Sequence, residues 1–438
     1  MNILVIGNGF DLAHGLPTRY TDFLEFCKRV FPIYESVEGR GVHLYQQEHL
    51  FGWDFNKETK EKLRRIYESR RKVILEKNLI RFQTDYPLLD EMYTLIKDNI
   101  WIEYFLQNTM YQKENWIDFE NEISQVIQSL DNDMHGLNKN YNLDDEIINL
   151  SNNFVSEKYS EYTFVVQQID IFDGKELPKS ITFREIRNHL LYDLNKLIRA
   201  LEIYLTVYVN EVQYNEESPD IKAVFEKKDE QGNIKAFIDT KILSFNYTTT
   251  FKRIYKHNFD IDYIHGKADI NNTIETNNMV LGIDEYLPKK RRNRETEFIA
   301  FKKFYQRIHK GTGCKYKEWT DTIKGEFADY QTELEKSKME RNIMNLKVRI
   351  NKLKNQYLNK HHLYIFGHSL DVTDKDILRD LILNDNVHTT IFYHDKDAMG
   401  QQIANLVKVI GQDELIRRTG GSTKTIEFKQ QQDMIKIS

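Results

Sequence analysis

The sequence predicts an α/β fold in which helices cover a parallel sheet and large helical segments are inserted between its strands. Five short β-branched or aromatic runs are typical of buried strands, and they lie at residues 3–6, 241–245, 261–264, 363–366 and 389–393. Long helical patterns separate several of these runs. Parallel strands need connections of a dozen or more residues, so this arrangement favours a parallel sheet.

Composition bounds the class of protein. The chain has 438 residues, of which 40% are hydrophobic and 12% aromatic, and this is typical of a globular protein. A net charge of -5 gives no whole-chain attraction to nucleic acid or anionic lipid. No run of 18 apolar residues occurs and the apolar N-terminal run is too short for a signal peptide, so we expect no membrane partner and a cytoplasmic location.

The low cysteine content also favours a cytoplasmic location. Cys27 and Cys314 are the two cysteines of the chain. Two thiols cannot build a disulfide framework or a four-thiolate zinc site, and their scarcity suits a reducing compartment. We therefore expect no metal.

The expected elements follow in order along the chain. After the strand at residues 3–6, no other strand is expected before residue 240, and an apolar stripe from Phe183 to Leu205 predicts a long helix with one buried face. Residues 317–360 form a second helical block with an apolar seam, which is either an arm that docks a partner chain or a solvated helix on the flank of the sheet. The polar segments 210–219 and 271–278 are expected to be loops. The basic run 289–294 is either an exposed loop or a contact for a phosphate backbone.

These patterns predict three parts. A discontinuous sheet domain comprises residues 1–24, 236–290 and 361–438, a helical insertion domain comprises residues 25–235, and a helical arm or hairpin comprises residues 291–360.

A glycine turn follows the first strand. The residues are Gly7, Asn8, Gly9, Phe10 and Asp11. A buried strand that breaks into Gly-x-Gly before a helix brings backbone amides close to a ligand, typically a phosphate, although a tight turn without a ligand has the same pattern. The dinucleotide fingerprint needs a third glycine where Leu12 stands, so an ordinary dehydrogenase is excluded.

Three later strands also end in polar residues. Asn246 follows the second strand, His265 and Gly266 follow the third, and the fourth leads into Gly367, His368 and Ser369. The carboxyl ends of parallel strands converge on one crevice, which is where open α/β sheets bind ligands. The sequence therefore predicts a site at this edge.

These residues carry a family resemblance. The opening from Leu4 to Thr18 resembles the start of the AbiH family of bacterial phage abortive-infection proteins. The motifs Phe245-Asn246-Tyr247-Thr248, His265-Gly266 and Gly367-His368-Ser369-Leu370 with Thr373-Asp374 are similar to later motifs of that family, and Trp116-Ile117-Asp118-Phe119-Glu120 is similar to another. The resemblance implies a bacterial phage-defence protein.

The same landmarks resemble, more distantly, the sirtuin-like NAD-binding fold, a Rossmann-like parallel sheet. Gly7 and Gly9 match its first glycine turn, Gly15 and Pro17 match its Gly-Ile-Pro, and Gly367 with Ser369 resembles its Gly-Thr-Ser turn. Asn246 and His265 match its Asn and catalytic His. The chain departs from that pattern in lacking cysteines for the zinc module, and in carrying Asp11 where the family has Ser.

The resemblance implies NAD+ as a substrate that is hydrolysed, since deacylation needs the missing zinc module. It implies catalytic roles for Asn246, His265 and Asp11, and it implies a cofactor-binding set, namely Gly7, Asn8, Gly9, Phe10, Gly15, Pro17, Gly266, Gly367, His368, Ser369 and Asp374. Further candidates are His14, Trp116, Asp118 and Glu120, although the sequence favours a helix start as the explanation of the last three.

Two other functions stay open. One is a non-catalytic sensor or scaffold that binds NAD+ or a related nucleotide, and the other is a nucleic-acid-targeting effector that uses residues 289–294. The partners expected are this nucleotide, a phage-derived trigger, and further copies of the chain assembled through the helical regions.

Overall fold

The computed structural model describes residues 1–35, 87–108, 111, 113, 117–137, 147–149, 180–212, 214, 216–338, 343–358, 360–421 and 424–437. The chain divides into two compact units. The sheet unit comprises Met1–Leu16, Tyr214–Lys267 and Gly311–Ser438, and the helical unit comprises Pro17–Gln213 and Ala268–Lys310.

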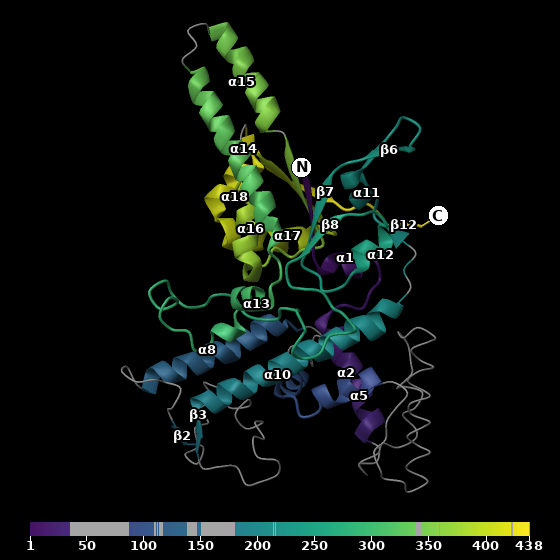
Figure 1. Ribbon diagram of the computed structural model, residues 1–438, viewed down its shortest axis with the longest axis vertical. Coiled ribbons are helices and arrows are strands. Elements are labelled where there is room, and N and C mark those ends of the chain that lie inside the picture. Colours follow the sequence, from purple (N-terminus) through teal and green to yellow (C-terminus); the bar gives the residue numbers. More distant parts are fainter. Residues whose placement is uncertain are drawn as a thin grey trace. The chain divides into compact units, whose positions relative to one another are not determined.

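The sheet unit is built on six parallel strands (Figure 1). Their spatial order is β11-β10-β9-β1-β7-β8, and every neighbouring pair is parallel. The strands are β1 (Asn2–Ile6), β7 (Thr240–Ser244), β8 (Asp260–Tyr263), β9 (His361–Phe366), β10 (Val387–Tyr393) and β11 (Ile426–Gln430). Numbered along the chain within this sheet, the order is 3-2-1-4-5-6, which is that of the doubly wound α/β folds. The order reverses between β1 and β9.

Side chains that alternate along the strands form two separate cores. Ile3 and Val5 pack with α14, α16 and α17 on one face, whereas Leu4 and Ile6 pack with α11 and α12 on the other. These helices are α11 (Pro219–Phe225), α12 (Thr250–Ile254), α14 (Lys315–Ser337), α16 (Lys375–Ile382) and α17 (Lys396–Ile410). Burial of both faces explains why the central strands are almost continuously apolar.

Smaller elements complete the sheet unit. A short helix α1 (Asn8–Ala13) follows β1, and α15 (Ile343–Tyr357) packs against α14. The others are β4 (Glu216–Glu217), β5 (Glu226–Lys228), β6 (Ile234–Phe237), η7 (Val372–Asp374), α18 (Gln412–Thr419) and β12 (Ile435–Lys436). β5 pairs with β6 and β4 with β12, each antiparallel.

The helical unit is organised around α10 (Phe183–Ile203), which continues as the π-helical turn η4 (Tyr204–Tyr208). Its core is aromatic: the Phe119 ring stacks between those of Tyr20 and Phe105, with centroids 4.2 and 4.1 Å away. The other elements are α2 (Tyr20–Glu35), α5 (Pro87–Ile96), α6 (Ile100–Gln107), α8 (Phe119–Leu137), β2 (Ile147–Asn149), β3 (Ser180–Thr182), η5 (Val209–Glu211), η6 (Ile299–Phe301) and α13 (Lys303–Lys310).

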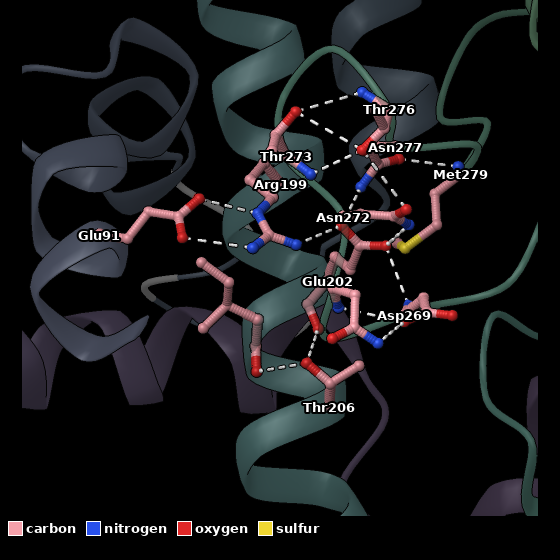
Figure 2. A network of polar contacts seen from close by, with 12 residues as sticks. Glu91, Arg199, Glu202, Thr206, Asp269, Asn272, Thr273, Thr276, Asn277 and Met279 are labelled. Atoms are coloured by element: carbon pink, nitrogen blue, oxygen red, sulfur yellow. Dashed lines mark hydrogen bonds and ion pairs between the residues drawn. The ribbon is translucent and has the colours of Figure 1, made fainter. Parts of the chain in front are cut away.

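A polar network inside this unit joins α10 to the loop after residue 268 (Figure 2). The fully buried Glu202 carboxylate accepts hydrogen bonds from Arg199 at 2.7 Å, Asn272 at 2.6 Å and Asn277 at 2.5 Å, and from the Asp269 amide at 3.0 Å. A buried carboxylate is stable only when its oxygens are paired in this way. The Glu202 side chain therefore links α10 to three residues of this loop.

The predicted α/β class and parallel sheet are confirmed, as are the five predicted strands and the long helix that begins at Phe183. The prediction missed β11, an edge strand whose residues Glu427, Lys429 and Gln430 are exposed. The expectation of no strand between β1 and residue 240 was wrong, because the short strands β2 to β6 lie there, in two-stranded pairings outside the main sheet. Residues 317–360 form the two packed helices α14 and α15 around the undescribed residues 339–342.

Other predictions met mixed outcomes. Residues 271–278 and 289–294 are turns and loops, whereas the expected loop 210–219 contains β4 and the start of α11. Residues 268–290 group with the helical unit and residues 311–360 with the sheet unit, whereas the sequence-based division put the former with the sheet and the latter in a separate arm. Within the described part of the chain, no helix is long and apolar enough to cross a membrane.

Candidate functional site

The turns after β1 and β9 meet backbone to backbone where the strand order reverses. The Gly9 amide donates to the Gly367 carbonyl at 2.8 Å, and the Gly7 amide donates to the Phe366 carbonyl at 3.1 Å. A Cβ on Gly367 would lie 2.2 Å from the Phe10 nitrogen, and one on Gly7 or Gly9 would lie 2.7 or 2.8 Å from the nearest backbone atom of the β9 turn. The glycines therefore allow two backbones to touch.

This contact bears on the two alternatives for the glycine turn. The amides of Gly7 and Gly9 donate to protein carbonyls, and the Phe10 amide donates to the Gly7 carbonyl at 2.8 Å. The sequence left open a phosphate-binding turn and a tight turn without a ligand, and the hydrogen bonds of these three amides favour the tight turn. Phe10 itself is fully buried in the core between the sheet and α12.

A histidine–carboxylate pair lies at the carboxyl ends of β8 and β9. His265 Nε2 is 3.0 Å from Asp374 Oδ1, and His368 Nε2 is 3.5 Å from Asp374 Oδ2. All three residues are at least nine-tenths buried. The Phe245 ring lies edge-on to both imidazoles, with centroids 5.5 and 4.3 Å away. One carboxylate thus faces two histidines.

Hydrogen bonding sets the tautomers of these rings. The Leu370 amide donates to His368 Nδ1 at 2.9 Å, so the proton of neutral His368 is on Nε2 and points to Asp374. For His265 the argument comes from Asp374, because a carboxylate can only accept. The proton of neutral His265 is therefore on Nε2 and the lone pair is on Nδ1. Leu370 is buried with a φ of 60°, a backbone conformation that is strained for leucine and that orients its amide toward His368.

Asp374 can face the two histidines because another residue, Asp371, caps the turn η7. Asp371 accepts a hydrogen bond from the Thr373 amide at 3.0 Å. Asp374 at the start of α16 makes no side-chain cap bond.

A second polar cluster lies beside β1 and β7. Asp11 is 1% exposed, and its Oδ2 accepts a hydrogen bond from Thr248 Oγ1 at 2.6 Å. Burial raises the pKa of Asp11 to about 6, and the nearby polar groups of Thr248, Thr250 and Asn246 partly oppose this rise.

Several buried atoms of this cluster have no hydrogen-bond partner among the residues that the structure describes. They are Asp11 Oδ1, Thr250 Oγ1 and both side-chain polar atoms of Asn246, a residue only 6% exposed. Buried polar groups are nearly always satisfied, so such a cluster indicates where water or a ligand group binds. The sequence proposed Asp11 and Asn246 for the site but missed Thr248 and Thr250, whose signal is the run of threonines after Asn246.

The remaining predicted residues have structural contacts. His14 Nδ1 lies 2.7 Å from the Phe10 carbonyl, and burial lowers the pKa of His14. Gly15 and Gly266 have φ values of 75° and 74° and close tight turns. Ser369 is exposed, its carbonyl accepting from Asn405 at 2.9 Å, and Asn8 is exposed at the start of α1.

Three described residues of the predicted site, namely Pro17, Asp118 and Glu120, belong to the helical unit. The Pro17 carbonyl accepts from the Tyr204 hydroxyl at 2.7 Å. Asp118 accepts the amides of Glu120 and Asn121 at 3.0 and 3.2 Å, and this supports the helix start considered for the segment. Glu120 forms an ion pair with Lys303 at 2.7 Å, and Trp116 lies outside the described residues.

The basic run is largely a solvent-facing turn. Arg291 forms ion pairs with Asp131 at 3.0 Å and Glu295 at 2.6 Å, whereas Lys289, Lys290, Arg292 and Arg294 are exposed.

Strand order and the polar residues at the carboxyl edge define a doubly wound α/β protein with a histidine–carboxylate pair beside the reversal point. The chain belongs to the family described as bacteriophage abortive infection AbiH, whose profile matches residues 3–394. Searches of curated proteins and of solved structures found no match. Membership confirms the first family resemblance and makes phage defence by abortive infection the functional class of the chain.

Proposed function

We propose that this protein acts in phage defence by hydrolysing NAD+ at the nicotinamide–ribose bond. The pairing of His265 with Asp374 carries the proposal, because it puts an oriented imidazole at the carboxyl edge of a doubly wound sheet. The sirtuin-like order of the sequence landmarks supports NAD+ as the ligand.

In the proposed reaction, the bond between ribose C1′ and the pyridinium nitrogen breaks, and its electron pair leaves with neutral nicotinamide. Water oxygen bonds to C1′, and the proton that it loses passes to His265 Nδ1 and then to solvent, leaving ADP-ribose. Asp374 holds the imidazole in the required tautomer and stabilises the imidazolium that forms. A positioned general base typically contributes about two to four orders of magnitude in rate.

Asn246 and Asp11 have complementary roles in this proposal. The transition state resembles an oxocarbenium ion, so a carboxylate nearby stabilises its positive charge. With a pKa of about 6, Asp11 is mostly ionised at neutral pH. The Asn246 amide offers both a donor and an acceptor to the water or to the nicotinamide carboxamide.

The test compares bacteria that produce the wild-type chain or a variant, challenged with a phage that the wild type restricts. NAD+ and free nicotinamide are measured after infection. We expect NAD+ to fall with the wild type, and nicotinamide release to fall by about two orders of magnitude or more in His265→Ala and Asp374→Asn. His394→Ala is the matched control because that side chain is 81% exposed, and we expect it to behave as wild type.

Protection at an unchanged NAD+ level would overturn the proposal, and so would undiminished release by His265→Ala. Calorimetric binding of NAD+ to the purified wild type, combined with absence of release in infected cells, would instead identify a non-catalytic sensor. The melting temperature of each variant separates loss of chemistry from loss of fold.

A further inference from the structure

A second functional surface lies at the opposite, amino-terminal edge of β10 and β11. A groove of about 620 Å³ is lined by Phe327 and Tyr330 of α14, Asn351 and Lys354 of α15, and Lys424 before β11. We call it the arm groove, because α14 and α15 pack side by side to form its wall (Figure 1). It shares no residue with the candidate site at the carboxyl edge.

The arm groove carries positive charge. α15 contains Lys347, Arg349, Lys352 and Lys354 but no acidic residue. Lys354 and Lys424 are exposed and make no ion pair within the described ranges. The lining residues Arg417 and Asp385 belong to a network of ion pairs with Glu414 and Arg418 in which two cations face two carboxylates, so Lys354 and Lys424 supply the positive charge of the lining.

Aromatic rings and amides line the same groove. The Phe327 and Tyr330 rings lie nearly parallel with centroids 6.0 Å apart, and Phe327 is half-buried. Asn351 and Asn355 add side-chain amides that both donate and accept hydrogen bonds. A volume of this size matches sites that hold a small organic group such as a nucleobase.

The groove adjoins a second one of about 570 Å³ between α11 and the face of β9, β10 and β11. The two grooves share His388, Lys424 and Thr425. The second adds the partly exposed rings of His362 and Tyr364 and the buried ring of Phe392. The Lys429 ammonium lies 5.4 Å from the Phe392 ring centroid and forms an ion pair with Asp220 at 2.9 Å, and Glu427 also lines this groove. Rings therefore continue along one path, whereas the lining cations without an ion pair among the described residues lie in the arm groove.

We propose that this path binds single-stranded nucleic acid. Lysines along a groove match the phosphates of a flexible strand, and the partly exposed rings of Phe327, His362 and Tyr364 offer surfaces for stacking of its unpaired bases. A duplex offers no free base faces to such rings. The net charge of the whole chain is -5, so binding depends on this local surface and weakens steeply with salt.

The test measures fluorescence anisotropy of labelled RNA and DNA strands of about 16 nucleotides with the full-length chain. We expect binding of at least one of the two strands, with an affinity that falls as salt rises from about 50 to 200 mM. Lys354→Gln with Lys424→Gln should weaken binding about tenfold and lower the slope of log K against log salt by about 1.4, since each phosphate contact contributes about 0.7. Phe327→Leu should weaken binding about tenfold with the salt slope unchanged.

Lys408→Gln with Lys436→Gln is the matched control, because both lysines are exposed and neither lines the grooves. Absence of wild-type binding at low salt, or equal weakening in the control, overturns the proposal. Equal binding of polyglutamate or of duplex DNA also overturns it and indicates an acidic protein partner or nonspecific attraction. Melting temperatures exclude misfolding, and Lys354→Arg with Lys424→Arg should restore binding if the loss is electrostatic.

Discussion

At the scale of single residues, the site combines groups whose protonation depends on burial. The two carboxylate oxygens of Asp374 lie 3.0 and 3.5 Å from the Nε2 atoms of two histidines, so donors face both oxygens inside the fold. Asp11 has no cationic partner in direct contact among the described residues, and its pKa rises from 3.8 to about 6 because burial disfavours the carboxylate. The two carboxyl groups therefore differ in what they do to stability.

We predict that Asp11→Asn stabilises the protein at neutral pH. Below about pH 4 the carboxyl is protonated in both states, and above about pH 6 the folded protein carries the full penalty of burying the charge. Stability therefore falls as pH rises through this window. Two pKa units correspond to at most about 3 kcal/mol, which Asp11→Asn should regain at neutral pH but not at pH 4.

Chemical denaturation at the two pH values measures this difference, and the exposed Asp433→Asn is the control. A gain for Asp11→Asn that is the same at both pH values, or a loss at neutral pH, would contradict the pKa assignment.

At the scale of elements, two close contacts decide the architecture. The first joins the turns after β1 and β9, and the second joins α10 to the loop after residue 268. Both depend on residues that a secondary-structure pattern does not single out.

We predict that Gly367→Ala destabilises the sheet unit by roughly 3 kcal/mol or more. Its φ is +66°, and the added Cβ would lie 2.2 Å from the Phe10 nitrogen. Gly15→Ala is the matched comparison, because Gly15 has a φ of +75° but no atom within 4 Å of the added Cβ. It should lose only about 1 to 2 kcal/mol. Equal losses in urea unfolding would show that backbone contact is not the cause.

We predict that Glu202→Gln destabilises the helical unit by about 3 to 5 kcal/mol, because an amide cannot accept all the donors that the carboxylate holds (Figure 2). Lys310 lies near this charge, and burial lowers the pKa of Lys310 to about 8. The exposed Glu185→Gln on the same helix should change stability by less than about 0.5 kcal/mol. Amide hydrogen exchange of the loop around Asn272 and Asn277 should rise only in Glu202→Gln; unchanged exchange there would exclude the tethering role.

At the scale of the whole molecule, neither unit is continuous in sequence. The chain passes between the two units at residues 16–17, 213–214, 267–268 and 310–311. Within the sheet unit, β1 lies between β7 and β9, so the first strand to be made is central to the sheet.

We predict that a chain lacking residues 1–7 does not fold. Loss of these residues would remove β1, the common neighbour of β7 and β9, and with it Leu4 and Val5, which belong to two different cores. A chain that ends at residue 432 lacks only the exposed β12 pairing and should keep most of its stability. The two truncated chains are compared by soluble yield and by melting followed by circular dichroism. If the chain without residues 1–7 melted cooperatively at the temperature of the full-length chain, the central role of β1 would be refuted.

The class of fold, five of the six strands of the main sheet and the family could all be predicted from the amino-acid sequence. Buried parallel strands have continuous apolar sequences, and the family motifs follow directly after them. Local sequence pattern was therefore sufficient to predict both the strands and the family. An edge strand such as β11 is half exposed and lacks that signal.

The contacts between polar residues that are distant in sequence became visible only in the folded structure. Asp374 and His265 are 109 residues apart in sequence, and Thr248 is 237 residues from Asp11, so no periodicity encodes either contact. The structure likewise showed that Gly7 and Gly9 contact another backbone, because a glycine is needed equally for a ligand and for a packed turn. Sequence pattern reports the environment of each residue, whereas the partner of a buried polar group depends on how distant strand ends come together.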